Sequence, residues 1–89
     1  MASIFPELDA YVEEYRDHIR RTVEWEGAQQ LADDFHKGII GMYETSHDKP
    51  EAIELIDKLR RVMRQKRPFE EKQAAVVKLL PFSVPEGRN

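Results

Sequence analysis

Apolar residues recur along most of this chain at the spacing of an α-helix. The first series has steps of four, three, four and four residues, which places its members on one helix face. It comprises Leu8, Val12, Tyr15, Ile19 and Val23. Pro6 suits the first turn of a helix because it has no amide hydrogen to leave unpaired. The pattern therefore predicts a helix over about 6–25.

A second apolar series of helical spacing begins after Gly27 and predicts a helix over about 27–44. Its members are Ala28, Leu31, Phe35, Ile39 and Met42. The first two helices can also be one bent rod, because an interior glycine costs a helix only about 1 kcal/mol.

Two glycines near the end of the second helix leave its C-terminus open. Gly38 can end the helix, but the apolar series continues past it, so we expect the helix to continue. Gly38 and Gly41 would then lie on one face, where another backbone can approach closely.

The next boundary is a polar segment over 45–49. Asp48 is a typical N-cap residue, Pro50 follows it, and Glu51 stands three residues after Asp48. These signals predict a third helix over about 49–66, which Arg67 and Pro68 end. Its inward residues are expected to be Ile53, Ile56, Leu59 and Met63, supported by Leu55 and Val62.

A shorter fourth helix is predicted over about 68–80. Its expected inward residues are Phe69, Ala74, Val77 and Leu80. Residues 81–89 contain two prolines and no periodic pattern, so they form an extended tail whose Phe82 and Val84 either pack on the core or await a partner. The sequence predicts an all-α fold: a small three- to four-helix bundle or helical hairpin assembly, with one domain over 1–80 and a tail over 81–89.

The composition suits a small helical protein with a thin core. The chain has 89 residues, of which 35% are charged. A chain of this size buries too little surface to be more than marginally stable alone, so we expect a homo-oligomer. The sequence contains no cysteine, which excludes a thiol nucleophile, a disulfide framework and a cysteine-ligated zinc site. The absence of a long apolar run and of a secretory signal predicts a cytoplasmic protein without a membrane partner.

The charges are distributed unevenly. Residues 1–57 carry 5 basic and 14 acidic side chains, whereas residues 58–89 carry 9 basic and 3 acidic ones. Six of those nine basic residues fall within ten positions. They are Lys58, Arg60, Arg61, Arg64, Lys66 and Arg67.

Part of this basic cluster has an ordinary structural explanation. Lys58 and Arg61 each have an acidic residue four positions earlier, which favours ion pairs along one helix. Arg60, Arg64 and Arg67 have none, and they fall within about 60° of one another on the polar side of the predicted helix. These three arginines suit a phosphate, an acidic protein surface, or the acidic half of this chain within a monomer or across a dimer.

The motifs of nucleotide-binding loops and serine hydrolases are absent. The sequence therefore predicts a small, non-catalytic intracellular interaction or regulatory protein without a cofactor, which docks as an adaptor or inhibitor on a partner with an acidic surface. Core or half-core packing is the default for Trp25. The alternative is an interface anchor, because exposed tryptophan is enriched at interaction hot spots, and on that ground Trp25 joins the basic cluster as a candidate contact. The predicted partner-binding residues are Trp25, Arg60, Arg61, Arg64, Lys66 and Arg67.

Two other functions stay open. A nucleic acid can bind the basic helix over 58–67 through its phosphates, although the acidic pI of about 5.6 and the lack of interleaved aromatic residues disfavour it. A metal-binding helical protein is the remote alternative. It would use Glu14 with Asp33 and His36, which stand one helical turn apart.

Overall fold

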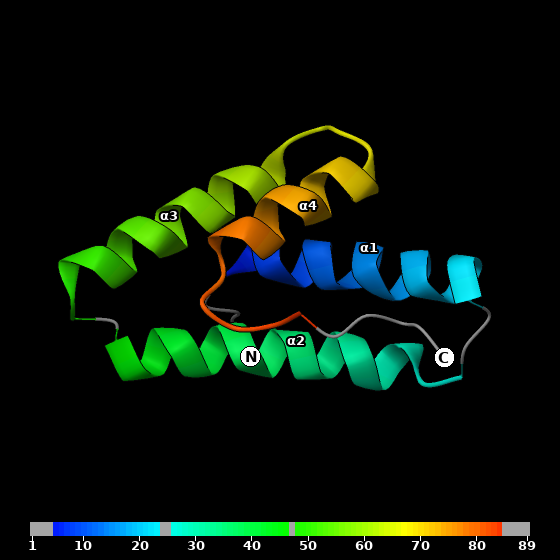
Figure 1. Cartoon of the computed structure of the whole chain (residues 1–89), viewed down its shortest axis with the longest axis horizontal. Coiled ribbons are helices and arrows are strands. Elements are labelled where there is room, and N and C mark those ends of the chain that lie inside the picture. Colours follow the sequence, from blue (N-terminus) through cyan, green and yellow to red (C-terminus); the bar gives the residue numbers. More distant parts are fainter. Residues whose placement is uncertain (1–4, 24–25, 47, 85–89) are drawn as a thin grey trace.

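The computed structural model of the chain describes residues 5–23, 26–46 and 48–84. These residues form four helices and no strand, which confirms the all-α prediction (Figure 1). The helices are α1 (Pro6–Val23), α2 (Ala28–Ser46), α3 (Pro50–Arg64) and α4 (Phe69–Leu79). None of the helices among the described residues is long and apolar enough to cross a bilayer.

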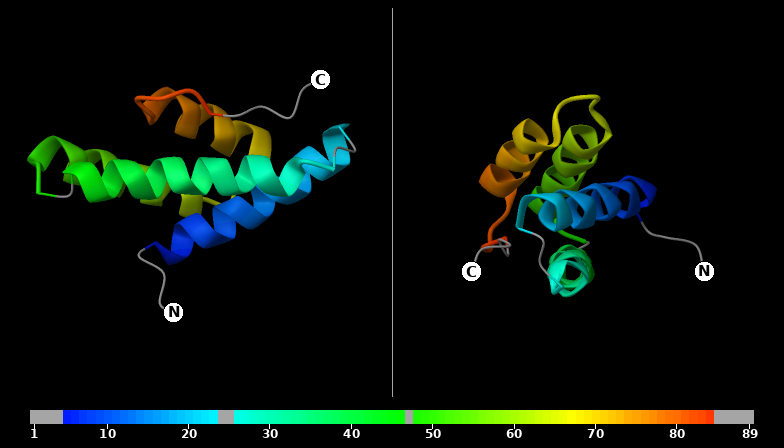
Figure 2. Two further views of the ribbon diagram at one scale, coloured as in Figure 1. Left: turned by 90° about the horizontal axis from the view of Figure 1, so that it is seen from below. Right: turned by 90° about the vertical axis from the view of Figure 1, so that its right-hand side faces the viewer.

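The four helices form two hairpins. α1 and α2 run antiparallel along most of their lengths, and α3 and α4 form the second hairpin. α1 lies between α2 and the second hairpin (Figure 2). Residues 26 and 27 form a turn, so the first two helices are separate elements and the alternative of one bent rod is wrong.

The core lies where the α1–α2 hairpin meets α3 and α4. The predicted inward residues of α1 are buried, apart from Val23, whose side chain lies outside the described residues. In α2, Leu31 and Met42 are only partly buried, whereas the other members of the series are buried. The buried core residues from the first hairpin are Phe5, Leu8, Tyr11, Val12, Tyr15, Ile19, Ala28, Ala32, Phe35 and Ile39.

The ends of α3 differ from the prediction. The residue before the helix is Lys49 in an extended conformation, and no side chain caps the helix, so the assignment of Asp48 as the N-cap is wrong. Pro50 in the first turn removes one of the amide groups that a cap would have to satisfy. The helix ends at Arg64, and Arg67 therefore lies in the α3–α4 connection rather than on the helix.

The buried face of α3 is narrower than the sequence indicated. Ile56, Leu59 and Met63 are buried as predicted, but Ile53 is 56% exposed. Three residues correspond to about 300° of helical rotation, so Ile53 stands about 60° from Ile56, beyond the edge that α1 and α2 cover. The prediction that Ile53 points inward is wrong.

The buried face of α4 is also different. Val76 is 0% and Lys72 4% exposed, whereas Val77 is 43% exposed and Ala74 lies on the exposed side. Ala74 and Val77 were predicted to point inward, and that prediction is wrong. The apolar residues of α4 itself occur on all sides of the helix, so their spacing does not define a single buried face.

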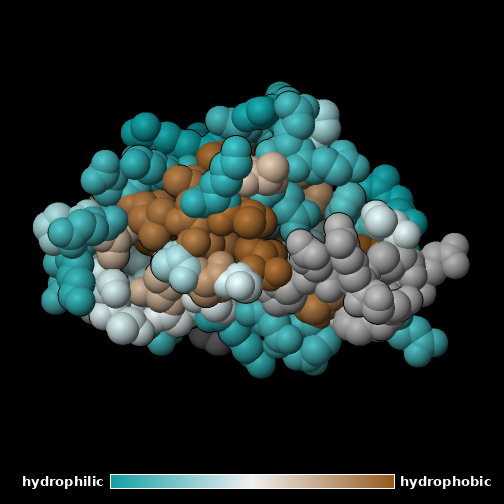
Figure 3. Space-filling view, viewed as in Figure 1, coloured by the Kyte–Doolittle hydropathy of each residue, from teal (hydrophilic) through white to brown (hydrophobic). Residues whose placement is uncertain are grey.

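The segment that follows α4 returns across α2. α2 continues through Gly38 as predicted, and two ring carbons of Phe82 lie 3.0 Å from the position that a Cβ atom at Gly38 would take. The neighbour of Gly38 is thus a side chain rather than a backbone, and nothing lies within 4 Å of the corresponding position at Gly41. Phe82 and Val84 pack against the core. Apolar residues gather on this face, between α2 and the second hairpin (Figure 3).

Candidate partner-binding site

The predicted binding residues separate into different environments in the structure. Trp25 lies outside the described residues. Of the basic cluster, Lys58 and Arg61 pair along α3, Arg60 packs on α1, and the last three residues gather at the α3–α4 connection. The linear cluster is therefore not one continuous surface.

Arg60 contacts the beginning of α1. Its guanidinium carbon lies 4.7 Å from the ring centroid of Phe5, and its Nε atom lies 3.9 Å from a carboxylate oxygen of Glu7. Both partners belong to the acidic half of the chain. The structure thus shows one of the alternatives left open by the sequence: this arginine pairs within the monomer.

Two basic residues form the helical ion pairs that the sequence predicted. Arg61 lies 2.9 Å from Asp57, and Lys58 lies 3.6 Å from Glu54. Arg61 is 74% exposed in its side chain. Exposed pairs of this kind contribute about 0–1 kcal/mol to stability, because water screens the charges and the side chains lose freedom. They can be exchanged for other partners at small cost.

The last three residues of the cluster line an open groove of about 740 Å³, here called the corner groove. It lies where α3 ends and α4 begins. Residues 63–68 and Lys72 form one wall, and the first turns of α1 form the other, with Pro6, Glu7, Ala10 and Glu14. The structure therefore brings Arg64, Lys66 and Arg67 together against α1 rather than along one helix.

Lys72 anchors the corner groove and was missed by the sequence analysis. Its ammonium nitrogen lies 2.9 Å from a carboxylate oxygen of Glu14, and its side chain is 5% exposed. A lysine can bury its aliphatic stem in this way if a carboxylate accepts its charge at the surface. One feature of the sequence could have indicated its burial: Lys72 stands one helical turn before Val76, on the side of α4 that packs on α1.

Aromatic rings beneath the groove hold the start of α4 on α1. The centroid of the Phe69 ring lies 5.1 Å from that of Tyr11, 6.1 Å from that of Tyr15 and 4.9 Å from that of His18. Such ring pairs each contribute about 0.5–1.5 kcal/mol beyond the area they bury. This packing fixes the α3–α4 connection and therefore the positions of its basic residues.

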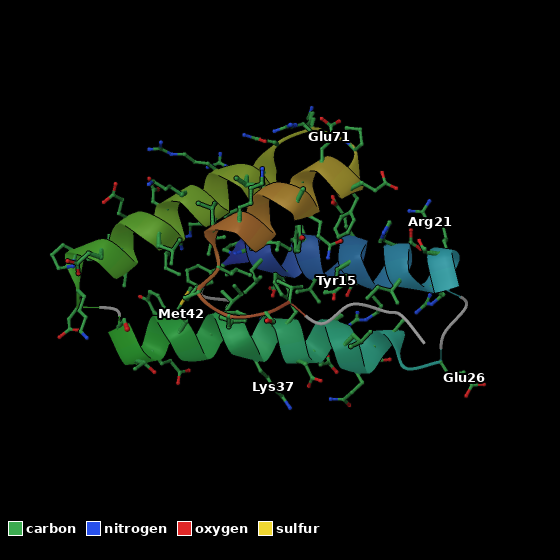
Figure 4. All side chains as sticks on the ribbon, viewed as in Figure 1. Tyr15, Arg21, Glu26, Lys37, Met42 and Glu71 are labelled. Carbon is green, nitrogen blue, oxygen red and sulfur yellow. The ribbon has the colours of Figure 1, made fainter. Side chains whose placement is uncertain are left out.

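The corner groove carries an excess of positive charge. Four cationic and two anionic side chains line it. Glu14 neutralises Lys72, and Arg67 lies 3.2 Å from Glu71 on the outer rim, next to the connection (Figure 4). The described residues supply no ion-pair partner for Arg64 or Lys66, and both are exposed. These two cations are available to an external carboxylate or phosphate.

A second groove, here called the acidic groove, lies at the other half of α3 and has a volume of about 650 Å³. Its floor is apolar, and its rim carries Glu54 and Asp57. The lining residues are Phe5, Tyr43, Pro50, Ile53, Glu54, Ile56, Asp57 and Arg60. The sequence pattern does not predict this groove, because it places Ile53 in the core.

The residues of the metal-binding alternative face different partners. Glu14 pairs with Lys72, and a carboxylate oxygen of Asp33 lies 3.3 Å from Arg16. His36 lies 3.7 Å from an oxygen of Asp9. Within the described part of the chain, no three histidine or acidic side chains are placed to share a metal ion.

Comparison of the chain with protein-family models, curated proteins and solved structures found no match. The function is therefore inferred from the corner groove itself.

Proposed function

We propose that this protein is a small non-catalytic interaction protein that docks on an acidic segment of a partner protein through the corner groove. The observation that carries the proposal is the gathering of Arg64, Lys66 and Arg67 on one exposed corner, two of them without an ion-pair partner among the described residues. An adaptor or an inhibitor would use such a surface.

Helix stabilisation alone does not explain why these basic side chains gather at the corner. A basic residue in the last turn favours α3, because it interacts with the negative end of the helix dipole. That reason applies to Arg64, the last residue of α3. It does not apply to Lys66, which follows the helix and is exposed. The guanidinium of Arg64 can bind a carboxylate in a bidentate manner, and the ammonium of Lys66 can attract a second one.

The groove suits separated carboxylates better than a nucleic-acid strand. Glu7 and Glu14 lie in its α1 wall and would repel a continuous run of phosphates. None of the described residues that line it is aromatic, so they offer no surface on which bases can stack. The chain as a whole has a net charge of −3, which opposes general attraction to a polyanion.

The hydroxyl of Tyr11 is not tuned for acid–base catalysis. Burial raises the pKa of this hydroxyl above its ordinary value of 10.0. A higher pKa keeps the phenol protonated and unreactive. Catalytic groups are normally tuned in the opposite sense, toward the working pH.

A binding experiment with two labelled probes tests the proposal. One probe is a fluorescein-labelled ten-residue peptide of alternating glutamate and glycine, and the other is a ten-nucleotide single-stranded DNA. We expect fluorescence anisotropy to show tighter binding of the peptide. The variant Arg64→Glu/Lys66→Glu/Arg67→Glu should bind the peptide at least about tenfold more weakly, equivalent to about 1.4 kcal/mol.

The control is a variant of equal charge change outside the groove. Arg20→Glu/Arg21→Glu/Lys37→Glu reverses three exposed residues of α1 and α2, of which Lys37 lies on the side of α2 away from the second hairpin (Figure 4). It should bind the peptide within about twofold of the wild type, because distant exposed charges are largely screened at physiological salt. Equal loss in both variants, tighter binding of the DNA, or no binding of either probe would contradict the proposal.

A further inference from the structure

The two grooves lie on either side of one contact between α1 and α3. The ion pair of Arg60 and Glu7 separates them, since Arg60 lines the acidic groove and Glu7 lines the corner groove. On one side stand the acidic rim and the exposed Ile53; on the other side stand the cations of the α3–α4 connection. The start of α1 and the length of α3 thus form a single seam with opposite charges at its two ends.

The two charged ends are well separated. α3 has 15 residues, which corresponds to a length of about 22 Å. Glu54 and Arg64 are ten residues apart, or about 15 Å along the helix axis. This distance exceeds the screening length of about 8 Å at physiological ionic strength, so each end interacts mainly with whatever lies directly opposite it.

We propose that a second copy of this chain docks on this seam. In that dimer the two α3 helices run antiparallel about a two-fold axis near Arg60 and Glu7. The acidic groove of each copy then faces the corner groove of the other, and Glu54 and Asp57 lie opposite Arg64 and Lys66 of the second copy. A two-fold axis produces the same complementary contact twice, which is the defining property of an isologous interface.

Charge complementarity identifies the second copy as the occupant. A partner for the whole seam needs an acidic end and a basic end in antiparallel order, and this chain supplies that arrangement itself. The intrahelical pairs of Glu54 and Asp57 are exposed and weak, so these carboxylates can exchange partners. Ile53, which is 56% exposed in the acidic groove, adds apolar surface that the dimer would cover.

The self-association and the proposed function are tested by separate experiments. Both use Arg64 and Lys66, so an acidic partner and a second copy would compete for the corner groove. The dimer is measured on the pure chain, and partner binding is measured with the labelled peptide. Failure of one experiment therefore leaves the other standing.

Sedimentation equilibrium of the full chain tests the dimer first. We expect a reversible equilibrium between the 10.5 kDa monomer and a dimer. Raising sodium chloride from about 50 mM to about 500 mM should increase the dissociation constant at least about tenfold, because the contact is between opposite charges near the surface. A chain that stays monomeric over the accessible concentration range would overturn the proposal.

A charge exchange between two variants locates the interface. Glu54→Lys/Asp57→Lys makes both ends of the seam basic, and Arg64→Glu/Lys66→Glu makes both ends acidic. Each variant alone should be monomeric at concentrations where the wild type dimerises, because like charges would face each other. An equimolar mixture should restore a dimer, since both contacts become complementary again, and native mass spectrometry will show that it contains one copy of each variant.

Circular dichroism shows whether each variant is folded. We expect the helix content of the wild type, because the substituted residues are exposed. Two results would overturn the assignment. Either variant alone could dimerise as the wild type does, which would place the interface on another face. The folded variants could also stay monomeric when mixed, which would show that the two ends do not meet.

Discussion

The ammonium group of Lys72 lies 2.9 Å from the carboxylate of Glu14 and joins α4 to α1. Lys72 is the buried charged residue of the described core, whereas Glu14 is 46% exposed in its side chain. The two partners are therefore unequal. Water can solvate the glutamate if the lysine is lost, but among the described residues Glu14 is the one carboxylate that pairs with the lysine.

This asymmetry predicts different costs for two substitutions. Glu14→Gln should destabilise the chain by about 1–3 kcal/mol, because it leaves a buried cation without a compensating charge. Lys72→Met should cost less or be neutral, because it keeps the volume and removes the charge that needs compensation. Urea unfolding followed by circular dichroism measures both. A larger loss for Lys72→Met than for Glu14→Gln would contradict the prediction.

The contact between Gly38 and Phe82 predicts a difference between two glycines of α2. Replacing an interior helical glycine by alanine stabilises a helix by about 1 kcal/mol. Gly41→Ala should show this full gain, since nothing lies within 4 Å of the new atom. Gly38→Ala should gain less, because its Cβ atom would lie 3.0 Å from the Phe82 ring and the ring must shift.

A double-mutant cycle checks this interpretation of Gly38. In the background of Phe82→Ala the obstacle is gone, so the two glycine substitutions should stabilise the chain equally, within about 0.5 kcal/mol. Thermal or urea unfolding of the wild type, the three single variants and the two double variants gives the six free energies needed. Persistence of the difference in that background would mean that the segment after α4 does not lie on α2 as described.

Tyr11 predicts a loss of stability at alkaline pH. Burial raises the pKa of its hydroxyl above the ordinary value of 10.0. The negative charges that the Tyr15 hydroxyl and the Glu14 carboxyl carry when ionised raise this pKa further. Below pH 10 the phenol is protonated in both states, and its contribution to stability is complete. Above pH 10 the unfolded chain releases this proton first, so stability falls as the pH rises toward the pKa of the folded state.

Tyr11→Phe tests this origin of the alkaline dependence. The variant should lose less stability than the wild type between about pH 9 and pH 11. At neutral pH it should be neutral or more stable by about 1 kcal/mol, because the Tyr11 hydroxyl is buried without a hydrogen-bond partner in the structure. Urea titrations at several pH values measure both effects. An unchanged pH dependence would assign the alkaline loss to other groups.

The face of α4 is tested by two neighbouring valines. Val76→Ala should cost about 2 kcal/mol, because Val76 is 0% exposed and its loss leaves a cavity. Val77→Ala should change stability by no more than about 0.5 kcal/mol, since this side chain is 43% exposed. Both substitutions remove the same atoms from the same helix, so each serves as the control of the other. Reversed costs would restore the face that the sequence predicted.

The contrast between α1 and α4 shows which buried faces can be predicted from the sequence. The large apolar residues of α1 occupy one side, so their spacing alone predicts which of them are buried. In α4, apolar residues occur on the face of Val76 and also on the face of Ala74 and Val77, so the pattern does not show which face is buried. The buried face is the one on which Lys72 pairs with Glu14 of α1. That contact joins residues 58 positions apart, and no local pattern contains it.

The candidate site shows the same limit. The sequence locates the basic cluster, because charge can be counted along the chain. It does not show that Arg60 turns toward Phe5 while Arg64 turns toward the corner groove, since that depends on where α1 crosses α3. The corner groove combines side chains from α1, α3 and α4. The basic cluster alone does not predict that α1 forms the second wall.

This division predicts opposite roles for two arginines one helical turn apart. Arg60→Ala should destabilise the chain by about 1 kcal/mol, because it removes the interaction with the Phe5 ring and the packing of the arginine stem on α1. Arg64→Ala should leave stability within about 0.5 kcal/mol, because its side chain is exposed and the described residues form no ion pair with it. The order reverses for the acidic peptide, whose affinity should fall for Arg64→Ala and change little for Arg60→Ala. Urea unfolding and fluorescence anisotropy on the same two proteins separate the roles, and a loss of peptide affinity that follows the loss of stability would show that neither arginine belongs to the site.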